Sequence, residues 1–134
     1  MPPILLTILG VPIPQGSKSL FRGRMVDANP KLKRWRKTVT AEAIRAYAGR
    51  MPLEGPVCVC VTFSLPRPSS VSVKRRPWPC VKPDVDKLLR ALLDGLTDAG
   101  IWGDDGQVVR VVACKVYARV PMEAGCSVEI SQHA

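Results

Sequence analysis

The sequence has few acidic residues and almost no histidine. Eleven Asp and Glu residues stand against 20 Lys and Arg, which gives a formal net charge of +9 over 134 residues. Because the single histidine, His133, is the penultimate residue, histidine-based acid–base catalysis and histidine-rich metal sites are nearly excluded. A positive excess of this size favours a polyanionic partner, nucleic acid more often than an anionic membrane, although a solvated basic surface is the plain alternative.

Long apolar runs and cysteine pairs are missing as well. No apolar stretch approaches the roughly 20 residues that a membrane-spanning helix needs, so no membrane partner is expected. The N-terminal MPPILLTILGVPIP lacks a basic leader and stops at prolines, which indicates a first strand rather than a signal peptide. The five cysteines are odd in number and form no C-x-x-C pair. This argues against a disulfide framework or a zinc site and fits a reducing cytoplasm.

The apolar patterns predict a single α+β domain over residues 1–134. The expected elements are strands at 4–12, 56–66, 107–120 and 125–132, and helices from Pro30 to a stop at Gly49 and from about Asp84 to Ala99. In the first helix we expect a buried stripe of Leu32, Trp35, Val39 and Ile44. The order β-α-β-α-β-β indicates a small mixed sheet with two main helices packed on it.

Two segments of the chain are strongly basic. Residues 18–37 contain eight Lys and Arg but only one acid, and residues 67–82 are rich in proline, serine and basic side chains. The second segment is predicted to be a loop. Its Trp78 suits either base stacking or packing as a loop anchor, whereas Trp102 is expected to anchor a turn.

The acids are concentrated in one region of this basic chain. Six of the eleven lie between residues 84 and 105, at Asp84, Asp86, Asp94, Asp98, Asp104 and Asp105. One interpretation is structural: Asp84 caps the helix and Asp86 favours its dipole, each worth about 1 kcal/mol or less, while Asp104 and Asp105 form a turn. The other interpretation is a metal site, since three carboxylates suit Mg²⁺ or Mn²⁺ better than zinc. A helix of this length carries the chain about 20 Å from its start. The acids can therefore meet only through the tertiary fold or across a dimer.

The stretch KPDVDKLLRALLDGLTDAGIWGDDGQVVRVVACKVYA, residues 82–118, resembles the RusA family of Holliday junction resolvases. These crossover junction endodeoxyribonucleases are often encoded by phages and prophages. The similarity comprises D-x-D, an apolar helix with an internal Asp, and then DAGIWGDDGQVV, an order far more specific than D-x-D alone. GVPIPQGSKSLFRGRM, residues 10–25, is more loosely similar to the opening segment of the family.

The resemblance implies a magnesium-dependent DNA endonuclease, with Mn²⁺ as the alternative ion, that acts in recombination and repair. Such enzymes are homodimers that cut four-way junctions by paired symmetric nicks and leave 5′-phosphate ends. Carried over, Asp84, Asp86 and Asp105 would be the catalytic metal ligands. Arg90 stands where the family has a lysine and would stabilise charge on the scissile phosphate; Lys87 stands where the family has Asn. Two other functions stay open: a non-catalytic DNA-binding protein with the same fold, and a nuclease of branched or flap DNA in general.

DNA contacts are expected from the basic segments and from the start of the second helix, because Lys and Arg neutralise phosphates. The residues expected to make them are Lys18, Arg22, Arg24, Lys74, Arg75, Arg76, Lys82 and Lys87.

Overall fold

The structure is a computed structural model that describes residues 2–16, 18–21, 24–27 and 30–133, with the backbone alone for the two short strands at 18–27. Its elements in chain order are β1 (Ile4–Leu9), β2 (Lys18–Phe21), β3 (Arg24–Asp27), α1 (Pro30–Ala46), β4 (Val57–Leu65), α2 (Val85–Asp98), η1 (Asp105–Gln107), β5 (Val108–Tyr117), η2 (Pro121–Glu123) and β6 (Gly125–Gln132). Apart from the β2–β3 pair, this is the predicted order.

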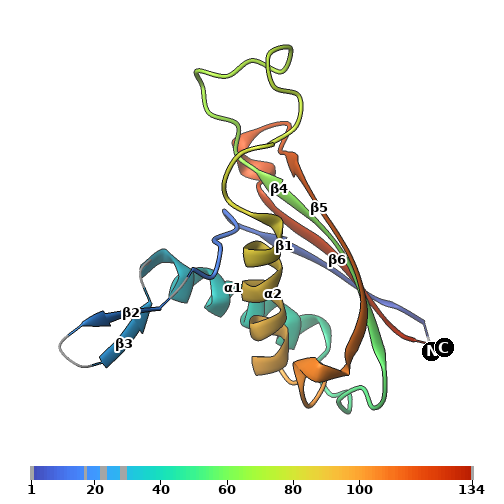
Figure 1. The fold of residues 1–134 in the computed structure, drawn as a ribbon. Coiled ribbons are helices and arrows are strands. Elements are labelled where there is room, and N and C mark those ends of the chain that lie inside the picture. The colour runs from blue at the N-terminus through green and yellow to red at the C-terminus, as the bar shows by residue number, and fades with distance from the viewer. Residues whose placement is uncertain (1, 17, 22–23, 28–29, 134) are drawn as a thin grey trace.

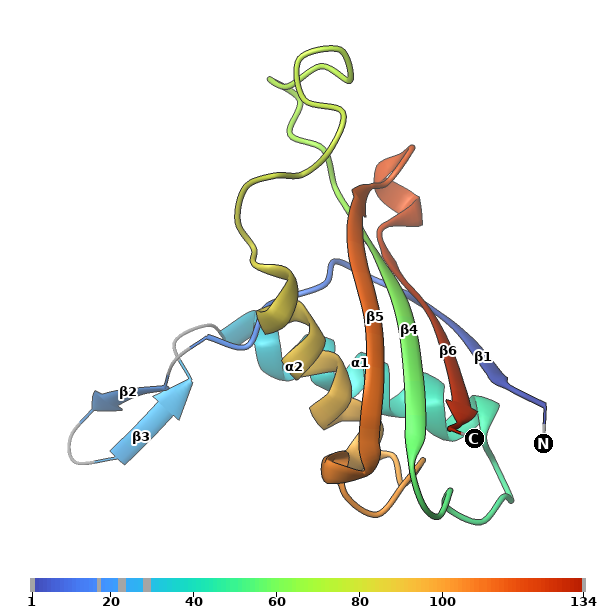
Figure 2. The ribbon, with the colours of Figure 1, turned by 45° about the vertical axis from the view of Figure 1, so that its right-hand side comes forward.

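Four of the strands form one mixed sheet in the order β1-β6-β4-β5. Strand β6 is antiparallel to both β1 and β4, whereas β5 runs parallel to β4. A parallel pair needs a crossover connection, and α2 provides it. Both helices lie on the same face of the sheet (Figures 1 and 2). The predicted α+β fold, a small mixed sheet with two helices, is confirmed.

The core lies between the sheet and the two helices. In α1 the buried residues include Leu32, Trp35 and Val39, as predicted. The fourth is Ala43 rather than Ile44, whose side chain is 51% exposed. The prediction of Ile44 was wrong because five residues after Val39 turn the helix well past its buried face, whereas four nearly complete a turn. Trp102 is 1% exposed and donates its indole N–H to Thr97 Oγ1 at 2.8 Å, so it anchors the turn as expected.

Two segments extend away from the sheet and helices (Figures 1 and 2): the β2–β3 hairpin and the long loop between β4 and α2. The hairpin was not predicted, because strands of four residues without an alternating apolar pattern give little signal. The loop was predicted from its proline and serine content. Within the described residues, no helix is long and apolar enough to cross a membrane.

Candidate active site

The D-x-D motif lies at the N-terminus of α2. Asp84 occupies the N-cap position in extended conformation, yet its side chain makes no capping hydrogen bond to the described backbone. Its carboxylate lies 3.9 Å from Lys87 Nζ. Asp86 is in the first turn, and both acids are exposed. Since a capping Asp accepts a hydrogen bond from a backbone N–H of the first turn, the Asp84 carboxylate is left available for a ligand.

Asp86, Arg90 and Asp94 follow one face of α2 at intervals of four residues, so their side chains lie in a row. Together with Asp105 they line a pocket of about 280 Å³. The fold thus returns Asp105 to the helix: the crossover ends at η1, immediately before β5. The neighbouring Asp104 has a different role, because its carboxylate accepts a hydrogen bond from the backbone N–H of Gly106 at 3.1 Å. Asp104 is therefore the turn residue of the pair.

The three predicted ligands are only partly brought together. Asp86 and Asp105 share the pocket, whereas Asp84 lines a neighbouring, larger cavity. In the part of the chain that the structure describes, no three His, Cys, Asp or Glu side chains are grouped closely enough to hold a metal ion. The donor chemistry nevertheless fits Mg²⁺, which takes oxygen ligands, keeps several waters and is commonly bound by one or two carboxylates together with substrate phosphates.

Asp94 is a pocket residue to which the sequence analysis gave no part in the metal site. Its signal in the sequence was its position eight residues after Asp86, which places it on the same helix face about 12 Å further along the axis. Arg90 lies between the two acids, four residues from each. Arg90 lines the same pocket as Asp86, which agrees with their spacing of four residues on one helix.

A second residue that sequence reasoning missed is Lys115 of β5. Its ammonium group donates hydrogen bonds to the carbonyl oxygens of Val81 at 2.6 Å and Pro83 at 2.7 Å. It therefore holds the segment that leads directly into Asp84. The alternation of side chains along a strand could have placed Lys115 on the helix side of the sheet. It shares a side of β5 with Val111 and Ala113, and these two pair with β4 residues whose side chains are buried under the helices.

The loop between β4 and α2 is ordered by its own arginines. The Arg67 guanidinium lies 4.1 Å from the centre of the Tyr117 ring and donates to the carbonyl oxygens of Arg76 at 2.6 Å and Ser72 at 3.2 Å. Arg76 donates from Nε to the Tyr117 hydroxyl at 2.8 Å. Arg76, which we expected to contact DNA, thus has an internal partner in addition.

The structure describes the side chains of four of the other predicted DNA contacts, and the backbone alone of two more. Lys74, Arg75, Lys82 and Lys87 are exposed on the long loop and the first turn of α2. Lys18 and Arg24 belong to the β2–β3 hairpin, where the structure describes the backbone, and Arg22 lies outside the described residues. Trp78 is 63% exposed, which favours a stacking surface over a packed loop anchor.

Comparison with known proteins agrees with this arrangement. The family profile described as Endodeoxyribonuclease RusA matches residues 10–131, nearly the whole chain. A comparison with curated proteins gave no match. The matched region contains D-x-D, the row of side chains on α2, the Asp104–Asp105 pair and Lys115. The chain therefore belongs to the RusA family and is an endodeoxyribonuclease of the Holliday junction resolvase class.

Proposed function

We propose that this protein resolves four-way DNA junctions by Mg²⁺-dependent paired nicks, with Mn²⁺ as an alternative ion. The observation that carries the proposal is the pocket on which Asp86, Arg90 and Asp105 converge from two elements. Carboxylates exposed on a surface meant for DNA would repel phosphate. A divalent cation reverses that repulsion, which explains why a basic protein places its acids there.

Each residue of the pocket has a distinct proposed role. Asp86 and Asp105 would hold the ion from one side, and Asp84 would complete the ligands from the start of α2. When bound, Mg²⁺ supplies a Lewis acid for the phosphoryl oxygen and an activated water. Arg90 would donate hydrogen bonds to the non-bridging phosphate oxygens. Since a guanidinium keeps its proton, the departing oxygen would be protonated by solvent rather than by Arg90.

DNA would reach this pocket along a basic path. Lys82 and Lys87 flank Asp84 in the sequence, and Lys74 and Arg75 are exposed on the loop. Lys18 and Arg24 of the hairpin, together with Arg22 of the same basic stretch of the sequence, are proposed as contacts further along the duplex arms. Contacts of this kind go to phosphates, so binding should weaken steeply as salt is raised and should vary little with DNA sequence.

A pair of symmetric nicks calls for two active sites related by a two-fold axis, so we propose a homodimer. The face of the sheet opposite the helices suits a second copy, since no described element covers it. It contains a groove of about 420 Å³ whose lining includes Leu5, Cys60, Val112 and Glu129. On the four strands, only Arg110 and Glu129 of this face are charged, and their charges cancel. Two copies of a protein of net charge +9 would therefore meet at a face that has no net charge of its own.

The test of the reaction compares adjacent acids. Labelled four-way junction and a duplex of the same sequence are incubated with wild type, Asp105→Asn and Asp104→Asn, in Mg²⁺ and in chelator. Wild type should nick the junction at paired symmetric positions only with Mg²⁺. Asp105→Asn should lose more than about 100-fold in nicking rate while still binding the junction. Asp104→Asn should keep its rate, because Asn caps a turn nearly as well as Asp.

Each alternative function predicts a different result. Tight junction binding without cleavage in any metal would contradict the proposal and favour a DNA-binding protein. Equal cleavage of flaps, forks and four-way junctions would favour a general nuclease of branched DNA. Equal loss in both Asn variants would show that the turn, rather than the Asp105 carboxylate, is what activity requires.

The dimer is tested separately by sedimentation of Val112→Arg. This change places a cation from each copy on the proposed contact face and should convert dimer to monomer. Met122→Arg, on η2 and 85% exposed, adds the same charge away from the sheet and should leave the dimer intact. Val112→Arg that sediments as wild type would contradict the assignment of this face.

A further inference from the structure

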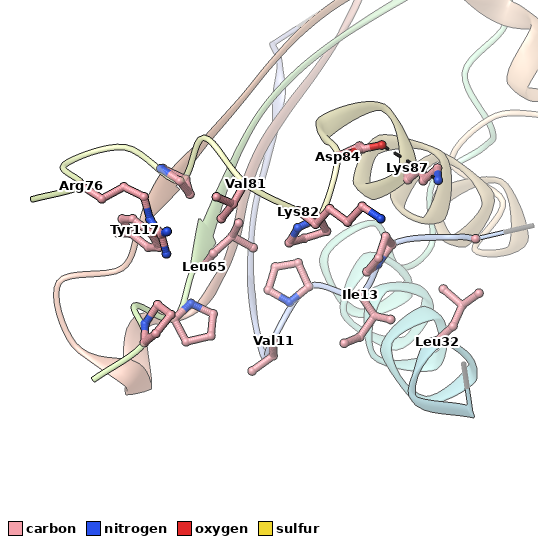
Figure 3. A pocket seen from close by; sticks show the side chains of 17 residues that line it. Val11, Ile13, Leu32, Leu65, Arg76, Val81, Lys82, Asp84, Lys87 and Tyr117 are labelled. Atoms are coloured by element: carbon pink, nitrogen blue, oxygen red, sulfur yellow. Dashed lines mark hydrogen bonds and ion pairs between the residues drawn. The ribbon is translucent and has the colours of Figure 1, made fainter. Parts of the chain in front are cut away.

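A second cavity lies beside the pocket of acids, and the proposed function assigns it no ligand. Its volume is about 530 Å³. It is bounded by the segment at 11–16, the two ends of the long loop, and the start of α2. Asp84 and Lys87 lie at one end of it, and Arg76 and Tyr117 at the other (Figure 3).

The walls are apolar and conformationally restricted. Six prolines line the cavity, at Pro12, Pro14, Pro66, Pro68, Pro79 and Pro83. Each has a fixed φ and lacks a backbone N–H, so these segments cannot easily rearrange. The backbone N–H of Gln15 donates to the carbonyl of Lys87 at 3.0 Å, which attaches one wall to α2. Lys115 holds the opposite wall through the carbonyls of Val81 and Pro83. The cavity is therefore preformed.

The charges around the cavity favour an anionic ligand. Lys82, Lys87 and Arg76 line it together with a single acid, Asp84. Tyr117 adds an aromatic surface that the Arg67 guanidinium covers at 4.1 Å. Binding sites for small organic groups have volumes of about 300–1,000 Å³. A flat ring with apolar faces, joined to a phosphate, meets these conditions, and a nucleotide is such a group.

We propose that this cavity takes one nucleobase, unstacked from the junction at a nucleotide next to the scissile phosphate. The inference rests on the proposed function, because Asp84 belongs both to the cavity and to the candidate metal ligands. Unstacking a base costs a few kcal/mol in a continuous duplex and less where pairing or stacking is already interrupted. A branch point interrupts stacking. Base capture would therefore align the phosphate at a junction and fail to do so on duplex DNA.

The experiment places 2-aminopurine, whose fluorescence rises when it leaves the stack, at successive positions around the branch point. Each junction is bound by protein carrying Asp105→Asn, which prevents cutting, with excitation above the tryptophan absorption band. We expect a rise of several-fold at one position within about two nucleotides of the nick made by wild type. Adding Val81→Trp, which fills the cavity from its wall, should return the signal to that of unbound DNA. It should also slow wild-type nicking about tenfold.

Val73→Trp is the matched control, because Val73 lies on the same loop, is 65% exposed and does not line the cavity. It should keep both the fluorescence rise and the nicking rate. Val11→Trp fills the cavity from the opposite wall and should act like Val81→Trp, which separates filling from a local defect of the loop. A rise that survives both filling variants reflects distortion of the DNA alone and overturns the inference. So does the absence of a rise at any position.

The two proposals fail in different ways. If wild type nicks junctions but no position becomes unstacked, the nucleobase site is wrong and the proposed function stands. If a position becomes unstacked and the filling variants abolish it, while no metal supports nicking, the nucleobase site stands and the proposed function is wrong.

Discussion

Lys115→Met removes the ammonium group that holds the segment before Asp84. The two hydrogen bonds to carbonyl oxygens, at 2.6 and 2.7 Å, are charge-assisted, and such bonds contribute about 1.5–3 kcal/mol each. The Val81 carbonyl lies at an exposed position, so the lower value applies and the pair is worth about 3 kcal/mol. If that free energy holds Asp84 in its working position, its loss lowers the nicking rate by at most about 150-fold.

The assay is single-turnover nicking of a four-way junction with protein in excess over DNA, so that binding does not limit the rate. We expect a lower rate at saturation, junction affinity within about twofold of wild type, and a lower melting temperature. Lys115→Arg can reach the same carbonyls with its guanidinium and should recover part of the rate. A merely structural loss would lower the melting temperature and leave the rate of the folded fraction unchanged.

Arg119→Met is the control for charge, because Arg119 lies just beyond the same strand and pairs only with the exposed Glu123 in the described contacts, at 3.2 Å. It should nick at the wild-type rate. Folded Lys115→Met that nicks as fast as wild type would refute the argument that Lys115 positions Asp84. So would an equal loss in Arg119→Met, since the cause would then be the charge of the surface and not the position of the segment.

Three further predictions follow from other contacts. Gly95→Ala would place a methyl group 2.7 Å from Val39 Cγ1 at the contact of α1 and α2. The overpacking cost of about 1–3 kcal/mol should offset or exceed the helix-propensity gain of about 1 kcal/mol. A melting curve that shows clear stabilisation would contradict this packing. Burial raises the pKa of the Cys126 thiol to about 12, so a thiol reagent at pH 8 should modify the exposed Cys80 in the folded protein and Cys126 only after unfolding. Because an unfolded cysteine ionises near about pH 8.5, the contribution of Cys126 to stability is present below that pH and is lost as pH rises toward 12, which denaturant titrations at increasing pH would detect. Asp94→Asn should lower the nicking rate by less than about tenfold. Asp94 lies about 12 Å along α2 from Asp86, which is too far for one ion to bind both carboxylates directly. A loss as large as that of Asp105→Asn would show that Asp94 is a ligand.

Local patterns in the sequence were sufficient for most of the fold. Alternation in VCVCVTFSL predicted β4, and the leucine spacing after D-x-D predicted α2, because each depends on periodicities of two or about 3.6 residues within one segment. The prediction that Trp35 is buried rested on the same rule and is confirmed. Ile44 shows its limit, since a stripe read over several turns can be assigned one residue off.

The active-site assignment had a different basis. The identities and order of Asp84, Asp86, Arg90 and Asp105 carried the family resemblance, and the family match over residues 10–131 confirms the class of enzyme. Whether these residues act as proposed remains a prediction. Periodicity could place Arg90 on the face of Asp86, because both belong to one helix. It could not place Asp105, which belongs to the far end of a crossover.

The sequence by itself determined the two helices and the four strands of the main sheet, since these depend on short-range spacing, and its resemblance to a known family supplied the class of the protein and the candidate residues. Only the tertiary structure decided which residues meet. It brought Asp105 to the pocket of Asp86, left Asp84 on the neighbouring cavity, and connected Lys115 to the carbonyls before Asp84. Those contacts join residues that are distant along the chain, and their geometry follows from how the crossover packs on the sheet. Asp84 and Asp86 are therefore neighbours at the start of one helix in the sequence, yet they line two different cavities in the fold.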